Sequence, residues 1–250
     1  MPRLYGAHTM CSNPTPIMNI TKHIPNTITC LNLFSGCIAC VMAFQGEYLC
    51  AALFIYLAAV FDFLDGMMAR VLNAYSHIGK ELDSLADMIS FGMAPGIILF
   101  SWLQIITPEN NLFLPYIAFL IPVFSALRLA KFNVDTRQTS SFIGLPTPAN
   151  AIFIASLISL HGESHLSGIL SDVRIIVILI LLLSFLLISG LPMFSLKFKA
   201  LTWKNNKTRY VFLILSFVLL AIFQLTAIPL IIVLFILMSL LLHLVNSKNQ

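Results

Sequence analysis

Four aspartates are the residues of this sequence whose type and spacing are best suited to chemistry. Asp62 and Asp65 lie three residues apart near the end of one apolar stretch, and Asp83 and Asp87 lie four apart at the start of the next. An ionisable group costs at least about 2.5 kcal/mol at the centre of a bilayer, so aspartates in such segments usually serve a function. A carboxylate cluster that includes no Cys or His favours hard cations, which predicts a Mg²⁺ or Mn²⁺ site rather than a zinc site.

Helical geometry places these aspartates beside small residues. At 100° per residue, one face of the first helix carries Asp62, Asp65, Gly66, Ala69 and Arg70. One face of the next helix carries Gly79, Asp83 and Asp87. The polar loop between them, residues 73–77, is short, so we expect antiparallel neighbours whose carboxylates face each other across a cleft. The small residues either let a phosphorylated ligand approach the backbone or let helices pack closely.

The elements that position these residues are expected to be membrane helices. Of the 250 residues, 59% are hydrophobic and 10% are charged, and the mean hydropathy is +0.94, whereas soluble domains carry roughly 25% charged residues. Segments that cross about 30 Å of hydrocarbon must satisfy their own backbone hydrogen bonds, which favours helices. We predict an all-α, polytopic membrane helix bundle with about eight transmembrane helices, at residues 27–45, 48–71, 82–105, 112–131, 147–164, 173–194, 209–225 and 227–246.

The basic residues predict the orientation of this bundle. If the N-terminus is cytoplasmic and the eight spans alternate, thirteen of the fourteen Lys and Arg residues fall on the cytoplasmic side, and Arg174 is the exception. This asymmetry is what the positive-inside rule expects of short loops. Both termini and the acidic cleft should then face the cytoplasm, in the inner membrane if the chain is bacterial. The net charge of +4 indicates orientation and contact with anionic membrane lipids, not nucleic-acid binding.

The acidic segments share a pattern with a known family. The residues read Asp62-x-x-Asp65-Gly66-x-x-Ala69-Arg70, eight residues, then Gly79-x-x-x-Asp83-x-x-x-Asp87. This pattern resembles the signature of the CDP-alcohol phosphatidyltransferases at all eight fixed positions, and Pro25-Asn26 resembles the start of their first helix. Segments similar to the phosphatidylserine synthase branch of that family are residues 83–87, 90–95, 128–133 and 144–149.

The resemblance implies a reaction and a set of roles. CDP-diacylglycerol would donate its phosphatidyl group to the hydroxyl of L-serine, with CMP as the leaving group. The metal ligands would be Asp62, Asp65, Asp83 and Asp87, and Asp87 would also be the catalytic general base. The nucleotide would be bound by Asn26, Thr29, Gly66, Ala69, Arg70 and Gly79.

The acceptor site and the flanking parts of the chain are assigned from fewer residues than the metal and nucleotide sites. A zwitterionic amino acid needs fewer cations than a dianionic phosphate. We expect Arg128 or Lys131 to bind its carboxylate, with Asn133 or Ser90 assisting. Glycerol phosphate, inositol phosphate and choline remain alternative acceptors, and a cation-coupled transporter is the alternative outside the enzyme class. We expect a tail at residues 1–23, a catalytic core at 24–165, and C-terminal helices at 166–250 that form a scaffold or a homodimer surface.

Overall fold

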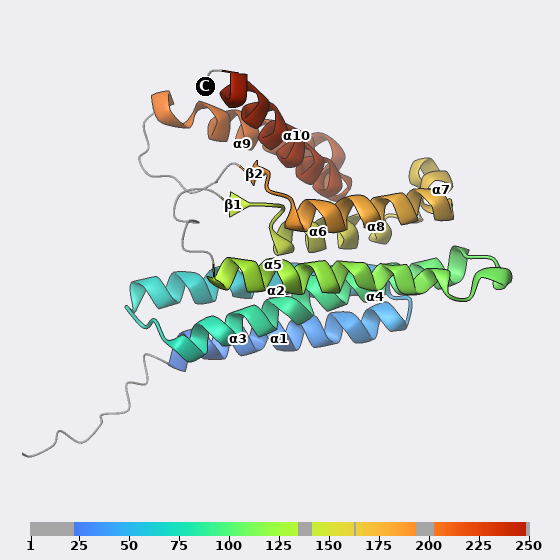
Figure 1. The fold of residues 1–250 in the computed structure, drawn as a ribbon, viewed down its shortest axis with the longest axis horizontal. Coiled ribbons are helices and arrows are strands. Elements are labelled where there is room, and N and C mark those ends of the chain that lie inside the picture. The colour runs from blue at the N-terminus through green and yellow to red at the C-terminus, as the bar shows by residue number, and fades with distance from the viewer. Residues whose placement is uncertain (1–22, 135–141, 163, 194–202, 249–250) are drawn as a thin grey trace, which may run out of the picture.

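The computed structural model describes residues 23–134, 142–162, 164–193 and 203–248, most of which lie in helices (Figure 1). In chain order the longer helices are α1 (His23–Phe44), α2 (Tyr48–Val71), α3 (His77–Asp87), α4 (Ala94–Ile106), α5 (Leu120–Val134), α6 (Thr147–Ser159), α7 (Ser164–Leu170), α8 (Val173–Ile188), α9 (Trp203–Phe223) and α10 (Ala227–Lys248). Shorter helical turns are η2 (Met88–Met93, a π-helix), η3 (Glu109–Asn111), η4 (Leu114–Phe119) and η5 (Gln224–Thr226). Two short strands, β1 (Phe142–Ile143) and β2 (Pro192–Met193), pair antiparallel.

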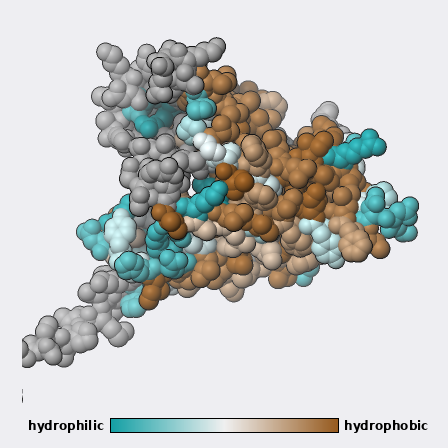
Figure 2. Space-filling model, viewed as in Figure 1, coloured by the Kyte–Doolittle hydropathy of each residue, from teal (hydrophilic) through white to brown (hydrophobic). Residues whose placement is uncertain are grey.

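The expectation of a helical membrane bundle is confirmed. Five helical segments of the described chain are long and apolar enough to cross a membrane: 23–44, 48–71, 77–106, 114–134 and 227–244. Three apolar helices are shorter: 147–159, 173–188 and 208–223. Hydrophobic residues cover the middle of the face in Figure 2, and hydrophilic residues gather toward its ends, as expected of a surface in contact with lipid. The number of eight spans and the orientation of the termini stay predictions.

Some predicted boundaries are wrong for local reasons. The third span was expected from residue 82, but its helix begins at His77, because the Ser76 side chain accepts a hydrogen bond from the backbone N–H of Gly79 at 2.9 Å and caps the first turn. The helix expected over 147–164 ends at Ser159. The helix expected over 173–194 ends at Ile188, where Ser189 has an extended backbone that leads into β2. Residues 1–22 of the predicted tail and residues 197–202 lie outside the described residues.

The helix formed by α3, η2 and α4 runs through the interior of the bundle. Buried residues make up 72% of its apolar window, against 33% for α1 and 28% for α2. The elements α1, α2, α5 and α6 all contact this central helix (Figure 1). In its N-terminal part Asp87 is buried and Asp83 is partly buried, so these two carboxylates face protein, whereas Glu81 is exposed.

Small side chains let α1 and α2 approach each other closely. The buried residues of this pair are mainly alanines and polar residues rather than large apolar ones, and they include Ala39, Ala43, Ala51 and Ala58. Close packing of small residues is a common way to associate helices in lipid, where the hydrophobic effect contributes little. The close pair fixes the start of α1 beside the end of α2, which is where the acidic residues lie.

Candidate active site

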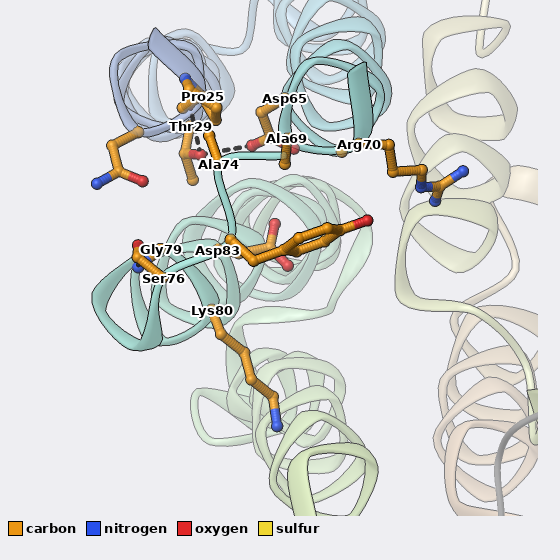
Figure 3. A pocket seen from close by; sticks show the side chains of 13 residues that line it. Pro25, Thr29, Asp65, Ala69, Arg70, Ala74, Ser76, Gly79, Lys80 and Asp83 are labelled. Carbon is orange, nitrogen blue, oxygen red and sulfur yellow. Dashed lines mark hydrogen bonds between the residues drawn. The ribbon is translucent and has the colours of Figure 1, made fainter. Parts of the chain in front are cut away.

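A cavity of about 230 Å³ lies where α1 begins, α2 ends and α3 begins (Figure 3). Its lining consists of Pro25, Asn26, Thr29, Asp65, Gly66, Ala69, Arg70, Ala74, Tyr75, Ser76, Gly79, Lys80 and Asp83. All six residues expected to bind the nucleotide are among them, although they come from three separate helices. The structure therefore brings the six together, and their role in nucleotide binding stays a prediction.

The small residues of this cavity serve two different purposes. A Cβ atom added at Gly66 would have no neighbour within 4 Å, so this glycine leaves open space above α2. A Cβ atom added at Gly79 would lie 2.9 Å from the Asn26 Oδ1 atom and 2.9 Å from the Ser76 Oγ atom. Gly66 thus fits the expectation of room for a ligand, whereas Gly79 is needed for the close contact of α3 with Asn26.

Positive charge is available along one wall of the cavity. The N-terminus of α3, which carries the positive end of the helix dipole, opens onto the cavity beside Arg70 and Lys80. In this structure the Lys80 Nζ atom donates a hydrogen bond to the backbone oxygen of Asn133 at 3.1 Å, which directs the side chain toward α5 (Figure 3). Helix N–H groups and flexible cations are the groups that bind phosphate oxygens in many proteins.

Three of the four aspartates form one cluster. Asp62 on α2 and Asp83 and Asp87 on α3 each offer a carboxylate oxygen, and these three atoms lie within 4.8 Å of one another. The Asp62 and Asp83 carboxyl groups are within hydrogen-bonding reach of each other. Ionised carboxylates repel at such distances, so a cation or a shared proton must lie between them.

The cluster fits a hard divalent cation. Its donors are carboxylate oxygens alone, which Mg²⁺ and Mn²⁺ prefer. Among the described residues, the buried Asp83 Oδ1 atom has no hydrogen-bond partner, so it has a free lone pair for a cation. The acidic cluster is therefore a site that can bind a divalent metal ion.

Asp65 lies beside this cluster. Its Oδ2 atom accepts a hydrogen bond from the Thr29 Oγ1 atom at 2.6 Å, and the same hydroxyl group also contacts the backbone oxygen of Pro25 at 3.0 Å (Figure 3). The Asp65 carboxylate is within electrostatic reach of Asp62 and Asp83. It lines the cavity, so it connects the acidic cluster with the space above Gly66.

Asn32 contacts Asp87 and was missed in the sequence. The Asn32 Nδ2 atom donates to the Asp87 Oδ1 atom at 3.3 Å, and both side chains are buried. The Ser90 Oγ atom donates to the backbone oxygen of Asn32 at 3.0 Å. The only signal in the sequence was an asparagine inside an apolar helix, three residues after Thr29 and so on nearly the same face.

The four residues expected to bind the acceptor do not gather at one place. The Arg128 guanidinium is buried, lies within electrostatic reach of Asp87, and donates to the Thr147 Oγ1 atom at 3.4 Å. Asn133 instead donates from Nδ2 to the Ser84 Oγ atom at 2.8 Å, and Lys131 is exposed. Ser90 is 0% exposed and lies against α1, where a Cβ atom added at Gly36 would be 2.3 Å from its Oγ atom.

A π-helical turn explains the position of Ser90. The helix is α-helical up to Asp87 and then continues as η2, in which the backbone N–H of Ala94 bonds to the carbonyl oxygen of Ile89, five residues back. A turn that is wider than an α-helical one changes the face on which the following residues lie, and such turns often occur at functional sites. Here it directs Ser90 toward α1.

Comparison with known proteins shows which family the region around the cavity resembles. The family model described as CDP-alcohol phosphatidyltransferase matches residues 22–186, which include the cavity, the acidic cluster and Arg128. A CDP-diacylglycerol–serine O-phosphatidyltransferase of Mycobacterium leprae is 34% identical over 178 residues, which cover 68% of this chain and 57% of the relative. The enzyme with the same name from Helicobacter pylori is 31% identical over 197 residues, 78% of this chain and 80% of the relative. An archaetidylserine synthase of Methanothermobacter thermautotrophicus is 35% identical over 159 residues, 63% of this chain and 66% of the relative. The chain thus spans a little over half the length of the mycobacterial relative.

Proposed function

Because the chain belongs to the CDP-alcohol phosphatidyltransferase family, we propose that it transfers the phosphatidyl group of CDP-diacylglycerol to the hydroxyl group of L-serine. The products are phosphatidylserine and CMP, and the reaction is a step of phospholipid biosynthesis. The observation that carries this proposal is the position of the acidic cluster at the edge of a cavity lined by all six expected nucleotide-binding residues. The names of three relatives, two for phosphatidyl transfer from CDP-diacylglycerol to serine and one for archaetidylserine synthesis, support serine as the acceptor.

The cavity is the proposed site of the cytidine diphosphate. Asn26 and Thr29 on α1, Gly66, Ala69 and Arg70 on α2, and Gly79 on α3 enclose it from three directions. The Arg70 guanidinium and the first turn of α3 provide positive charge for the pyrophosphate. The exposed Tyr75 ring at the rim offers a flat surface on which the cytosine base can stack. The acyl chains would remain in the surrounding lipid.

The acidic residues are the proposed metal ligands. Asp62, Asp65, Asp83 and Asp87 would hold Mg²⁺ or Mn²⁺, which when bound neutralises charge on the pyrophosphate. The protein's own contribution is to keep these carboxylates close together on two adjacent helices before substrate arrives.

Asp87 is the proposed general base. Its carboxylate accepts the proton of the serine hydroxyl as the serine oxygen forms a bond to the phosphorus that carries diacylglycerol. The bond from that phosphorus to the oxygen of CMP breaks in the same displacement. Asn32 holds the Asp87 Oδ1 atom, which leaves the second carboxylate oxygen to accept the proton.

The serine is proposed to enter from the side of Arg128. Among the expected acceptor residues this one is a buried cation within electrostatic reach of Asp87, and its charge suits the carboxylate of an amino acid. Lys131, the alternative to Arg128, is exposed, and Asn133 or Ser90 was expected to assist. Their contacts favour other roles for Asn133, which joins α5 to α3, and for Ser90, which joins η2 to α1.

The orientation and the roles of the outer regions remain proposals as well. The eight helices with both termini cytoplasmic would place the cavity at the cytoplasmic face of the inner membrane if the chain is bacterial. Residues 24–165 would form the catalytic core. The helices of residues 166–250 would form a scaffold or a homodimer surface.

A comparison of acceptors tests the proposed function. Purified protein is incubated with CDP-diacylglycerol and Mn²⁺ or Mg²⁺, and CMP release is measured with serine, glycerol 3-phosphate, inositol phosphate and choline. We expect serine to give the fastest release, and Asp87→Asn serves as the inactive control. Faster release with another alcohol would refute serine and keep the family's reaction, and no release with any alcohol would contradict the enzyme assignment.

A further inference from the structure

The Asn150 side chain on α6 is buried without a partner. It is 0% exposed, and among the described residues neither its Nδ2 atom nor its Oδ1 atom has a hydrogen-bond partner. Buried polar groups in folded proteins are nearly always hydrogen-bonded, because an unpaired one retains its full desolvation cost. An amide with both ends unpaired thus suggests a polar molecule that this structure does not contain.

Asn150 lies close to the buried arginine. The Thr147 hydroxyl group at the start of α6 accepts a hydrogen bond from the Arg128 Nη1 atom at 3.4 Å. Asn150 follows Thr147 by three residues. It therefore lies about 60° around α6 from Thr147 and about one turn farther along the helix. The Arg128 Nε atom is also buried without a hydrogen-bond partner in the described part of the chain. Unpaired polar atoms therefore occur on two helices, α5 and α6, at neighbouring positions.

Asn150 also lies at the depth of the acidic cluster. Helices α2 and α6 are in contact and run in opposite directions (Figure 1), and the Tyr56 hydroxyl group is within hydrogen-bonding reach of Ser156. Asp62 follows Tyr56 by six residues, and Asn150 precedes Ser156 by six. At 1.5 Å per residue, both lie about 9 Å from that contact in the same direction. The amide thus lies at about the same depth in the bundle as Asp62.

We propose that Asn150 is a specificity-determining residue that binds the amino-acid acceptor together with Arg128. A carboxamide presents a donor and an acceptor side by side, which match the carboxylate and the ammonium group of an α-amino acid. The Nδ2 atom donates to the serine carboxylate, whose other oxygen is bound by Arg128, and the Oδ1 atom accepts from the ammonium group. This assignment rests on the proposed transfer to serine.

The experiment compares the KM for serine with the KM for CDP-diacylglycerol in Asn150→Leu and Asn150→Ala. Loss of a hydrogen bond to a charged group predicts that the KM for serine rises about 10- to 100-fold, while the KM for CDP-diacylglycerol stays within about twofold. The Leu variant removes two unpaired polar atoms at similar volume, so we expect its melting temperature to equal or exceed that of the wild type. Ser156→Ala is the matched control, because Ser156 is buried on the same helix but donates to the Phe153 backbone oxygen at 2.9 Å.

Serine analogues test separately the contact of Asn150 with the carboxylate and its contact with the ammonium group. Ethanolamine lacks the carboxylate and 3-hydroxypropionate lacks the ammonium group. The wild type should prefer serine to both, and Asn150→Leu should lose most of this preference. Two results would overturn the proposal: a serine KM like that of the wild type in a folded Leu variant, or an equal rise of both KM values with a lower melting temperature. If the wild type itself gave no transfer to serine, the proposed function would fail instead.

Discussion

Replacing Asn32 tests whether the orientation of Asp87 matters for the reaction. Within the described residues, the Asn32 Nδ2 atom donates a hydrogen bond of 3.3 Å to the Asp87 carboxylate. We predict that Asn32→Ala lowers kcat and leaves the KM for CDP-diacylglycerol nearly unchanged, because Asn32 is not among the residues that line the nucleotide cavity.

The size of the effect follows from this distance. A hydrogen bond to a charged group contributes about 1.5–3 kcal/mol, and a bond of 3.3 Å is at the long end of the range, so we take about 1.5 kcal/mol. This corresponds to an approximately tenfold lower kcat. Asn32→Asp has nearly the same shape but places a second carboxylate beside Asp87, so it should lose more activity than the Ala variant.

A double-mutant cycle isolates the contact. Turnover is measured for Asn32→Ala, Asp87→Asn and the double variant, with the melting temperature of each in detergent. If Asn32 acts through Asp87, its replacement should cost little once Asp87 has been changed. Full additivity of the two losses, or an Asp variant more active than the Ala variant, would refute this account of Asn32.

Three further predictions concern the metal site, the nucleotide and the orientation. Asp62→Asn, Asp65→Asn, Asp83→Asn and Asp87→Asn should each lose at least about 100-fold in activity and bind Mn²⁺ more weakly in calorimetry; near-normal turnover in two of them would refute the assigned site. Tyr75→Ala should raise the KM for CDP-diacylglycerol about tenfold, because stacking on a base contributes about 1–3 kcal/mol. Tyr75→Phe keeps the ring and should leave this KM unchanged. An equal rise of the KM in both variants would show that the hydroxyl group, and not the ring, contacts the nucleotide. In a variant without native cysteines, Asn110→Cys should react with a membrane-impermeant thiol reagent in intact cells and His77→Cys only after permeabilisation, and the reverse pattern would invert the orientation.

Positions on one helix were predicted well from the sequence. The period of the α-helix places Asp62 with Gly66 and Asp83 with Gly79 without knowledge of the rest of the fold. The family signature then linked these two helices with Asn26 and Thr29, and the structure brings all these residues to one cavity or its edge.

Contacts between distant helices were not predictable in this way. Asn32 and Asp87 are 55 residues apart, and nothing in the local pattern indicates that their helices place them face to face. Asn150 follows the segment that resembles the relatives, but only its burial without partners distinguishes it from an ordinary helix residue. Ser90 was assigned to the acceptor because its segment resembles the phosphatidylserine synthase branch, whereas the π-helical turn after Asp87 directs it toward α1.

The length of the helices was also hard to judge from hydropathy. The span expected at 147–164 was extended over residues 160–162, which the structure places in a turn, and the span expected at 173–194 was extended over residues 189–193, which lead into or form β2. Hydropathy averages over a window, and it does not register a local stop such as the extended backbone at Ser189.

Incorporation of labelled serine into lipid tests the central claim most directly. Purified protein is incubated with CDP-diacylglycerol, radiolabelled serine and Mn²⁺ or Mg²⁺, and the organic phase is analysed for labelled lipid alongside the CMP formed. We predict one labelled phosphatidylserine for each CMP released, dependence on the added metal, and loss of both products in Asp87→Asn. CMP released without label in the lipid, or labelled lipid formed equally well by Asp87→Asn, would contradict the proposed transfer.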